Sequence, residues 1–247
     1  MQTIELTQNN IYQGNLILVN DKHQLKMDYE KELVEYKGQI MHRDVSKMLD
    51  YAFCKLQVES QIKIISGYRC FNEQKELYET SLKENGWEYT KKYVAYPRCS
   101  EHETGLAIDL ALLQDKIDFI CPSFPYEGIC QQFRDICHQY GFIERYKKDK
   151  QDLTHIDQEP WHFRYVGFPH SQIIEDKKLC LEEYHQFIKK YSIYQPLQFV
   201  HRQQLIEIFY VPVTNDHTTI CIKDDALYQI SGNNKDGVIV TLWRTCL

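Results

Sequence analysis

The 247-residue sequence has no run of apolar residues long enough to cross a membrane and no block of basic residues. A membrane-spanning helix needs about 20 consecutive apolar residues, and the run "NLILVN" is far shorter. The net charge of −6 argues against nucleic acid as a partner. The amino-terminal residues also lack the basic and apolar regions of a secretory signal peptide. We therefore expect a cytoplasmic protein without a membrane anchor.

The cysteines form no C-x-x-C pair, and their number, nine, is odd. They are residues 54, 70, 99, 121, 130, 137, 180, 221 and 246. In a chain without an export signal, this usage indicates reduced and mostly buried thiols. A cysteine-rich zinc site is the alternative, but the spacing of the cysteines does not match such sites. Internal repeats and low-complexity segments are absent as well.

The periodicity of the apolar residues predicts a mixture of helices and strands. Helical spacing predicts helices within residues 28–56 and over residues 72–82, 129–140 and 175–191. Alternating or continuous apolar residues predict strands at 15–19, 62–66, 105–112, 142–146 and 161–167. Near the carboxyl terminus, short strands are expected at 206–213, 218–223, 226–231 and 238–243. The chain is long enough for one large domain, or for one domain with a small appendage.

The segment "CSEHETGLAIDLAL", residues 99–112, places a charged residue where an alternating strand is expected to be buried. Asp109 lies on the face that Ala107 and Ala111 share, where a carboxylate is costly unless it is paired. A divalent metal would remove that cost. His102 lies at the start of the same segment, and Gly105 lets the chain bend between the two side chains.

A second segment, "EPWH" at residues 159–162, supplies a third ligand in His162. One carboxylate, two imidazoles and an open fourth position form a catalytic zinc arrangement. Zinc lowers the pKa of a water molecule that it binds to about 7 and polarises a carbonyl group. Glu159, just upstream of His162, is placed to act on that water without being a ligand.

Each of these residues also fits a purely structural role. A histidine beside a strand is often hydrogen-bonded within the fold, and a strand aspartate is often paired with an arginine or lysine. The "EPWH" segment could be a turn with a packed tryptophan. Taken singly, the residues leave both interpretations open, and their conjunction favours the metal site.

The pattern S-x-H-x-x-G-x-A-x-D at residues 100–109, followed by E-x-W-H at 159–162, resembles the zinc D-alanyl-D-alanine peptidases of the VanY/VanX group. "SGYRCFNEQKELY" (66–78) and "GNLILVNDKHQL" (14–25) resemble segments of the same family, and the similarity spans roughly residues 10–190. Without a signal or anchor, and with a carboxyl-terminal extension, the chain is most similar to the VanXY group. Those soluble enzymes combine dipeptidase and carboxypeptidase activities in vancomycin resistance.

The resemblance implies an α+β fold with a central, mainly antiparallel sheet and flanking helices, plus a small β-rich carboxyl-terminal segment. Residues 1–195 are expected to form the catalytic domain, and residues 196–247 an extension packed on it. That extension could shape the substrate entrance, contribute to an oligomer contact or be a packing appendage. The segments 87–98 and 111–127 flank the motif and could form walls or a lid over the substrate.

The resemblance also implies roles for seven residues. The zinc ligands would be His102, Asp109 and His162. Glu159 would be the general base and later the acid, and Arg69 would face the scissile carbonyl. Ser100 and Gln74 match positions that hold the substrate. For these last three, structural alternatives stay open: an ion pair of Arg69 with Glu73 or Glu76, a turn cap at Ser100, and an exposed helix position for Gln74.

The implied substrates are the dipeptide D-Ala-D-Ala and a pentapeptide precursor of peptidoglycan, with Zn²⁺ as the cofactor. A homodimer is compatible with the sequence, and no nucleic-acid or membrane partner is expected. Two alternative functions stay open. One is an endolysin-type peptidoglycan peptidase on the same scaffold. The other is a non-catalytic, zinc-stabilised binding module similar to the hedgehog signalling domain.

Overall fold

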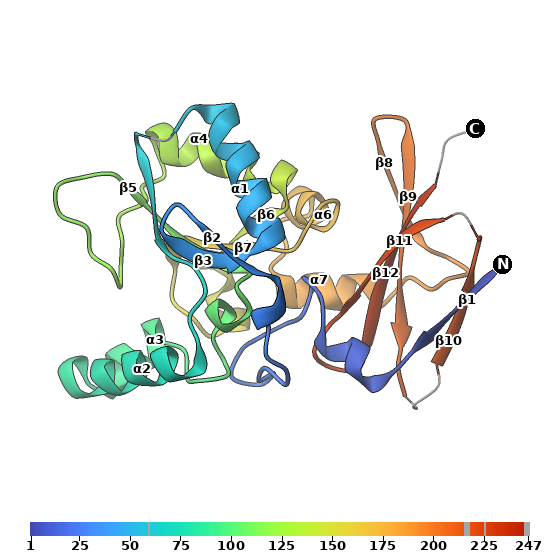
Figure 1. The fold of residues 1–247 in the computed structure, drawn as a ribbon, viewed down its shortest axis with the longest axis horizontal. Coiled ribbons are helices and arrows are strands. Elements are labelled where there is room, and N and C mark those ends of the chain that lie inside the picture. The colour runs from blue at the N-terminus through green and yellow to red at the C-terminus, as the bar shows by residue number, and fades with distance from the viewer. Residues whose placement is uncertain (59, 215–217, 225, 245–247) are drawn as a thin grey trace. The chain divides into compact units, whose positions relative to one another are not determined.

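The computed structural model describes residues 1–58, 60–214, 218–224 and 226–244 (Figure 1). The chain forms two compact units, one made of Val19–Cys180 and the other of Met1–Leu18 together with Leu181–Leu247. Both units contain antiparallel sheets and helices, which confirms the expected α+β fold. Among the described residues, no helix combines the length and the apolar character that crossing a membrane requires.

The unit Val19–Cys180 is built on a four-stranded sheet in the order β4-β5-β7-β6. Its strands are β4 (Ile62–Ser66), β5 (Ala107–Leu112), β7 (Glu159–Tyr165) and β6 (Phe142–Tyr146). Every neighbouring pair is antiparallel, as the sequence predicted. The segment "AIDLAL" alternates Ile108 and Leu110 with Asp109, and all of these residues are buried. One face of the sheet therefore carries the core, while the other face carries polar groups.

The apolar face of the sheet packs against α1 (Arg43–Leu56) and α4 (Gly128–Cys137). Phe53 of α1, Phe133 of α4 and Phe163 of β7 are fully buried, and the Phe133 ring packs edge-on against the other two. In Figure 1, α1 and α4 lie together, whereas α2 (Phe71–Asn85) and α3 (Trp87–Tyr93) lie away from them. Burial of these aromatic side chains is a main source of stability for this unit.

The remaining elements of this unit are short. They are η2 (Glu30–Glu32), the hairpin β2 (Leu33–Tyr36) and β3 (Gln39–His42), η3 (Glu101–Thr104), η4 (His138–Tyr140), η5 (Lys148–Lys150), α5 (Gln151–Thr154) and α6 (His170–Asp176). The sequence predicted neither this hairpin nor a helix in the flanking segment 87–98, where Trp87–Tyr93 form α3. The single helix predicted over 175–191 is wrong, because α6 ends at Asp176 and α7 (Leu181–Ile188) begins separately.

The unit of Met1–Leu18 and Leu181–Leu247 contains a four-stranded antiparallel sheet in the order β11-β12-β9-β8. Its strands are β11 (Leu227–Gly232), β12 (Gly237–Arg244), β9 (Gln204–Pro212) and β8 (Leu197–His201). The amino-terminal strand β1 (Gln2–Leu6), which precedes η1 (Gln8–Tyr12), pairs with β10 (Thr218–Ile222). The four strands predicted in the carboxyl-terminal segment are confirmed, whereas β1 and β8 were not anticipated.

The strand predicted at residues 15–19 is wrong, although the segment is buried. The backbone N–H of Leu16 donates to Ser231 Oγ at 2.8 Å, and that of Leu18 donates to the Asn233 carbonyl at 3.3 Å. Ser231 at the end of β11 and Asn233 in the turn that follows therefore satisfy these two backbone N–H groups without a strand pairing.

The pairing of β1 with β10 assigns the first residues of the chain to the same compact unit as the last ones. Helix α7 also belongs to that unit, where it contacts β9. The units therefore divide the chain after Leu18 and Cys180. The boundary between residues 195 and 196 stays a prediction about the limits of the catalytic domain.

No cysteine in the described part of the chain forms a disulfide. Buried cysteines are Cys99, Cys130, Cys137 and Cys180, whereas Cys54 and Cys221 are exposed. Cys246 lies outside the described residues.

The bend that leads into β5 depends on the backbone conformation of Gly105, and a substitution there tests this dependence. Gly105 has φ +69°, and a Cβ atom there would lie 2.6 Å from Leu33 Cδ2 and 3.0 Å from the His42 nitrogen. Gly38 has a similar backbone, φ +80°, with nothing within 4 Å. We expect Gly105→Ala to lower the free energy of unfolding by about 1–3 kcal/mol more than Gly38→Ala, because only the first adds an overlap to the backbone strain. Equal losses in chemical denaturation would contradict this.

Candidate metal centre and its pocket

The pairing of β5 with β7 places Asp109 directly opposite His162. Directly opposed residues of an antiparallel pair project from the same face, so the carboxylate and the imidazole meet above the sheet. His102 lies in η3, immediately before β5, and the left-handed backbone at Gly105 turns the chain from one element into the other. The pairing of β5 with β7 and the bend at Gly105 thus bring the side chains of His102, Asp109 and His162 together.

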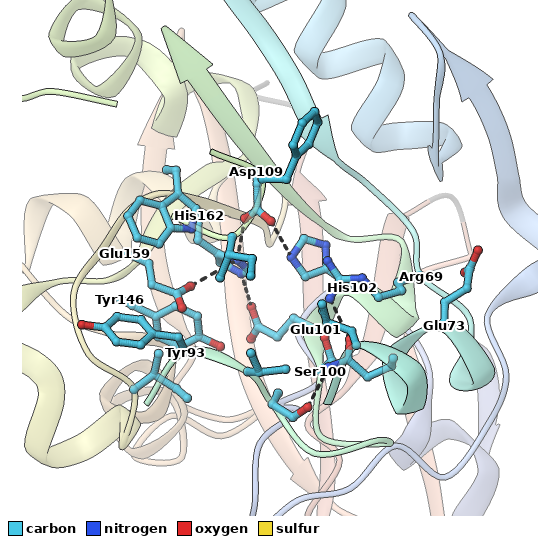
Figure 2. Close-up of a pocket in the computed structure, with 18 of the residues that line it drawn as sticks. Arg69, Glu73, Tyr93, Ser100, Glu101, His102, Asp109, Tyr146, Glu159 and His162 are labelled. Atoms are coloured by element: carbon cyan, nitrogen blue, oxygen red, sulfur yellow. Dashed lines mark hydrogen bonds and ion pairs between the residues drawn. The ribbon is translucent and has the colours of Figure 1, made fainter. Parts of the chain in front are cut away.

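The three side chains converge on one point (Figure 2). His102 Nε2 lies 3.1 Å from Asp109 Oδ2, and His162 Nδ1 lies 3.0 Å from Asp109 Oδ1. One ligand atom from each residue lies within 4.8 Å of the others, and all three residues are buried. Two imidazole nitrogens and a carboxylate oxygen are a donor set that zinc takes in catalytic sites.

The outer nitrogens of both imidazoles have their own partners. His102 Nδ1 lies 2.7 Å from the carbonyl oxygen of Gly67, which can only accept, so this nitrogen donates. His162 Nε2 lies 3.4 Å from Glu101 Oε2. The centre is therefore faced by the other nitrogen of each ring, His102 Nε2 and His162 Nδ1, and by Asp109. Hydrogen bonds to the outer nitrogens commonly orient metal-binding histidines in this way. The residues present fit Zn²⁺.

Glu159 is buried beside this centre without being part of it. Its Oε2 lies 3.7 Å from His162 Nδ1. Burial raises the pKa of Glu159 to about 8; the carboxylates of Asp109 and Glu101 add to the shift, and His162 opposes it. A carboxyl group with a pKa near neutrality can both take up and release a proton.

The charges of the centre depend strongly on one another. Burial alone would raise the pKa of Asp109, but His102 and His162 outweigh it and hold that pKa well below its usual range. Burial would lower the pKa of His162, but its hydrogen bonds to Asp109 and Glu101 raise it to about 10. The site therefore favours a positive charge between its carboxylates.

Arg69 lies at the edge of the centre and its guanidinium is fixed in place. Nη1 donates to Gln74 Oε1 at 2.8 Å, and Nη2 donates to Ser66 Oγ at 3.0 Å. Gln74 in turn donates to the Ala95 carbonyl at 2.6 Å. Gln74 is buried, not exposed, and the guanidinium bonds to Gln74 and Ser66 rather than to the glutamates of α2.

These residues line a pocket of about 360 Å³, which brings together all seven residues singled out from the sequence. Ser100 lies on its wall and is itself buried. Tyr93, Val94 and Ala95 contribute from the segment 87–98, and Phe119 and Ile120 from the segment 111–127. Both flanking segments therefore form walls of the pocket, as their position in the sequence suggested.

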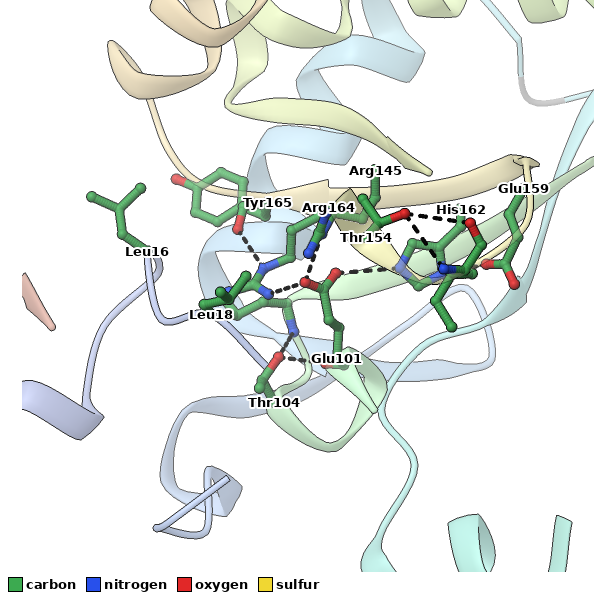
Figure 3. A network of polar contacts seen from close by, with 12 residues as sticks. Leu16, Leu18, Glu101, Thr104, Arg145, Thr154, Glu159, His162, Arg164 and Tyr165 are labelled. Carbon is green, nitrogen blue, oxygen red and sulfur yellow. Dashed lines mark hydrogen bonds and ion pairs between the residues drawn. The ribbon is translucent and has the colours of Figure 1, made fainter. Parts of the chain in front are cut away.

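Sequence reasoning missed Glu101, Arg145 and Arg164, which lie behind His162 (Figure 3). All three are buried charged residues. A signal was available, because the predicted strands "FIERY" and "WHFRYVG" each carry one arginine among residues expected to be buried. Such arginines need a carboxylate partner.

The sequence matches the VanY family, described as D-alanyl-D-alanine carboxypeptidase, over residues 38–168. It is 44% identical over 181 residues to the bifunctional D-Ala-D-Ala dipeptidase and carboxypeptidase VanXYC of Enterococcus gallinarum, covering 71% of this chain and 95% of that protein.

Two solved structures are also similar. One is the vancomycin-resistance D,D-dipeptidase VanXYg in complex with a D-Ala-D-Ala phosphinate analogue, with a TM-score of 0.96 and 49% identity over 98% of this chain and 99% of that one. The other is a mutant of the D,D-pentapeptidase VanY from a VanB-type resistance cassette in complex with Zn(II). It has a TM-score of 0.60 and 31% identity, over 69% of this chain and 98% of that one.

Asp109→Asn tests the metal centre, because it keeps the shape of the side chain and removes the anionic ligand. We expect it to weaken Zn²⁺ binding by more than about 100-fold, beyond what the loss of an outer partner costs. Competition with a chromophoric chelator measures this. Asp135→Asn on the exposed side of α4 is the control and should bind like the parent. A variant that binds within threefold of the parent would exclude Asp109 as a ligand.

Proposed function

The chain belongs to the VanY family of D-alanyl-D-alanine carboxypeptidases, and on that basis we propose that it is a zinc-dependent D,D-peptidase. It hydrolyses the dipeptide D-Ala-D-Ala and removes the terminal D-Ala from pentapeptide precursors of peptidoglycan. The observation that carries the proposal is the convergence of His102, Asp109 and His162 beside Glu159 in one buried pocket. By destroying both substrates, the enzyme leaves precursors with other carboxyl-terminal residues, which accounts for a role in vancomycin resistance.

The cofactor is Zn²⁺, held by His102, Asp109 and His162. When bound, it supplies a Lewis acid that activates water and polarises the scissile carbonyl. Glu159 accepts the proton of the attacking water and later delivers it to the departing amine. Its pKa of about 8 suits both steps, since the same carboxyl group must be ionised first and protonated later.

Arg69 stabilises the negative charge that develops on the scissile carbonyl oxygen. Because Gln74 and Ser66 hold its guanidinium in advance, no reorganisation is needed as that charge forms. Burial lowers the pKa of Arg69, while the carboxylates of Asp109 and Glu73 oppose the shift. Ser100 and Gln74 bind the substrate from the pocket wall, and Gln74 also accepts a hydrogen bond from the Arg69 guanidinium.

The sequence leads to one further prediction, a cytoplasmic location, and leaves two questions open: whether the chain forms a homodimer, and whether the carboxyl-terminal strands shape the substrate entrance, form an oligomer contact or are a packing appendage. Both proposed substrates are made in the cytoplasm, which supports the predicted location. Size-exclusion chromatography with light scattering measures the oligomeric state directly.

Release of D-alanine from D-Ala-D-Ala and from a pentapeptide precursor tests the proposed activity. Zinc-loaded protein should release D-alanine from at least one of them, and Glu159→Gln should lower kcat by about 10²- to 10⁴-fold while zinc stays bound. Glu79→Gln, on the exposed side of α2, is the control. Zinc-loaded protein that releases D-alanine from neither substrate would argue against the peptidase and leave the binding module as an alternative. Cleavage of cross-linked stem peptides without release of D-alanine would favour the endolysin.

Arg69→Lys separates oxyanion stabilisation from metal binding. Lysine keeps the charge but cannot reproduce the two guanidinium hydrogen bonds to Gln74 and Ser66. We therefore expect kcat to fall by about 10²- to 10³-fold at unchanged zinc affinity. Arg43→Lys, in an exposed pair with Glu32, should leave both unchanged. A change in KM alone would assign Arg69 to substrate binding rather than to the transition state.

A further inference from the structure

The carboxylate of Glu101 contacts two buried arginines, Arg145 and Arg164, and also faces His162 (Figure 3). Arg145 Nε donates to Glu101 Oε1 at 2.9 Å, and Arg164 Nη1 lies 2.9 Å from the same oxygen. The side chains of Glu101 and Arg164 are 0% exposed and that of Arg145 is 1% exposed. The three charged groups are therefore shielded from bulk solvent, and two cations contact the same oxygen of the carboxylate.

The second carboxylate oxygen of Glu101, Oε2, faces His162. Glu101 Oε2 lies 3.4 Å from His162 Nε2. The His162 ring is confined as well, since the ring of Tyr146 lies 4.9 Å away and that of His102 lies 5.1 Å away, centroid to centroid. The imidazole thus has one outer partner and little room to turn over.

We propose that Glu101, held by Arg145 and Arg164, is a positioning residue that fixes which nitrogen of His162 faces the metal. A carboxylate clamped by two cations only accepts hydrogen bonds, so His162 must carry its proton on Nε2. In the zinc-loaded protein, the lone pair of Nδ1 would then face the metal beside Asp109, whose Oδ1 lies 3.0 Å from Nδ1. A carboxylate partner also makes the imidazole a stronger ligand.

The two histidines are oriented by different devices. His102 donates from Nδ1 to the Gly67 carbonyl and presents Nε2 to the centre. His162 donates from Nε2 to Glu101 and presents Nδ1. The ligands are therefore protonated at opposite nitrogens, and only His162 depends on a charged side chain and its two counter-ions. The inference rests on the proposed function in that Zn²⁺ is the bound metal.

Glu101→Gln tests the proposal sharply. The two guanidiniums hold the amide oxygen, so the amide NH₂ turns to His162 Nε2, which must then accept. The proton moves to Nδ1, the nitrogen that should bind zinc. We expect Zn²⁺ affinity, measured by chelator competition, to fall by roughly 10- to 100-fold or more. The visible absorption spectrum of the Co²⁺-loaded protein should also change, because it reports the ligand set.

Glu103→Gln is the matched control. Glu103 lies in the same short helix, is also buried and accepts a hydrogen bond from the Arg98 backbone at 2.6 Å, so Glu103→Gln makes the same chemical change in the same turn. It should keep the parental zinc affinity and Co²⁺ spectrum. If Glu101→Gln also binds like the parent, or if both variants lose equally, Glu101 is only a structural counter-ion and the proposal is overturned.

A measurement on the parent protein decides the matter if Glu101→Gln does not fold. Ring-nitrogen NMR of the zinc-loaded, ¹⁵N-histidine-labelled chain should show His162 protonated at Nε2 and His102 protonated at Nδ1. Coordination of His162 through Nε2 overturns the assignment. A parent protein that binds no zinc at all overturns the proposed function together with this inference, an outcome distinct from parental binding in the variant.

Discussion

The metal centre depends on the register between β5 and β7, which sets Asp109 opposite His162. A slip of one residue would turn one of these side chains into the core, because successive residues of a strand face opposite sides. The core prevents that slip: Ile108 and Phe163, which neighbour the two ligands along their strands, pack against α1 and α4 on the other face. The aromatic cluster beneath the sheet therefore holds the ligands above it.

Around this register, the protein arranges buried charges so that each has a defined partner. Asp109 faces two histidines, and Glu101 faces two arginines and the outer nitrogen of His162. Glu159 Oε2 lies farther from its neighbouring cation, 3.7 Å from His162 Nδ1, and burial raises its pKa to about 8. We therefore propose different tasks for three carboxyl groups of one pocket, because their neighbours differ: Asp109 as a metal ligand, Glu101 as a support for His162 and Glu159 as a proton carrier.

The sequence anticipated much of the sheet and of the pocket. The strands 62–66, 105–112, 142–146 and 161–167 have strong periodic patterns and form the central sheet. The segment 15–19 looks equally strand-like, yet its N–H groups at Leu16 and Leu18 donate to Ser231 at the end of β11 and to Asn233 in the following turn. Glu101 was also missed because its role depends on residues that are distant in the sequence. The sequence shows that it precedes His102, but its partners Arg145 and Arg164 lie on later strands.

The sequence by itself determined the residue types and spacing of the centre: a histidine, a bend at Gly105, a buried aspartate, and a later glutamate and histidine. These features are local, because a strand alternates its faces and a glycine permits a bend whatever surrounds them. Only the tertiary structure decided which nitrogen of each histidine faces inward, how Arg69 is held, and that Glu101 belongs to the site. Those properties depend on contacts between strands and loops distant in sequence, which form only when the sheet pairs and the core closes.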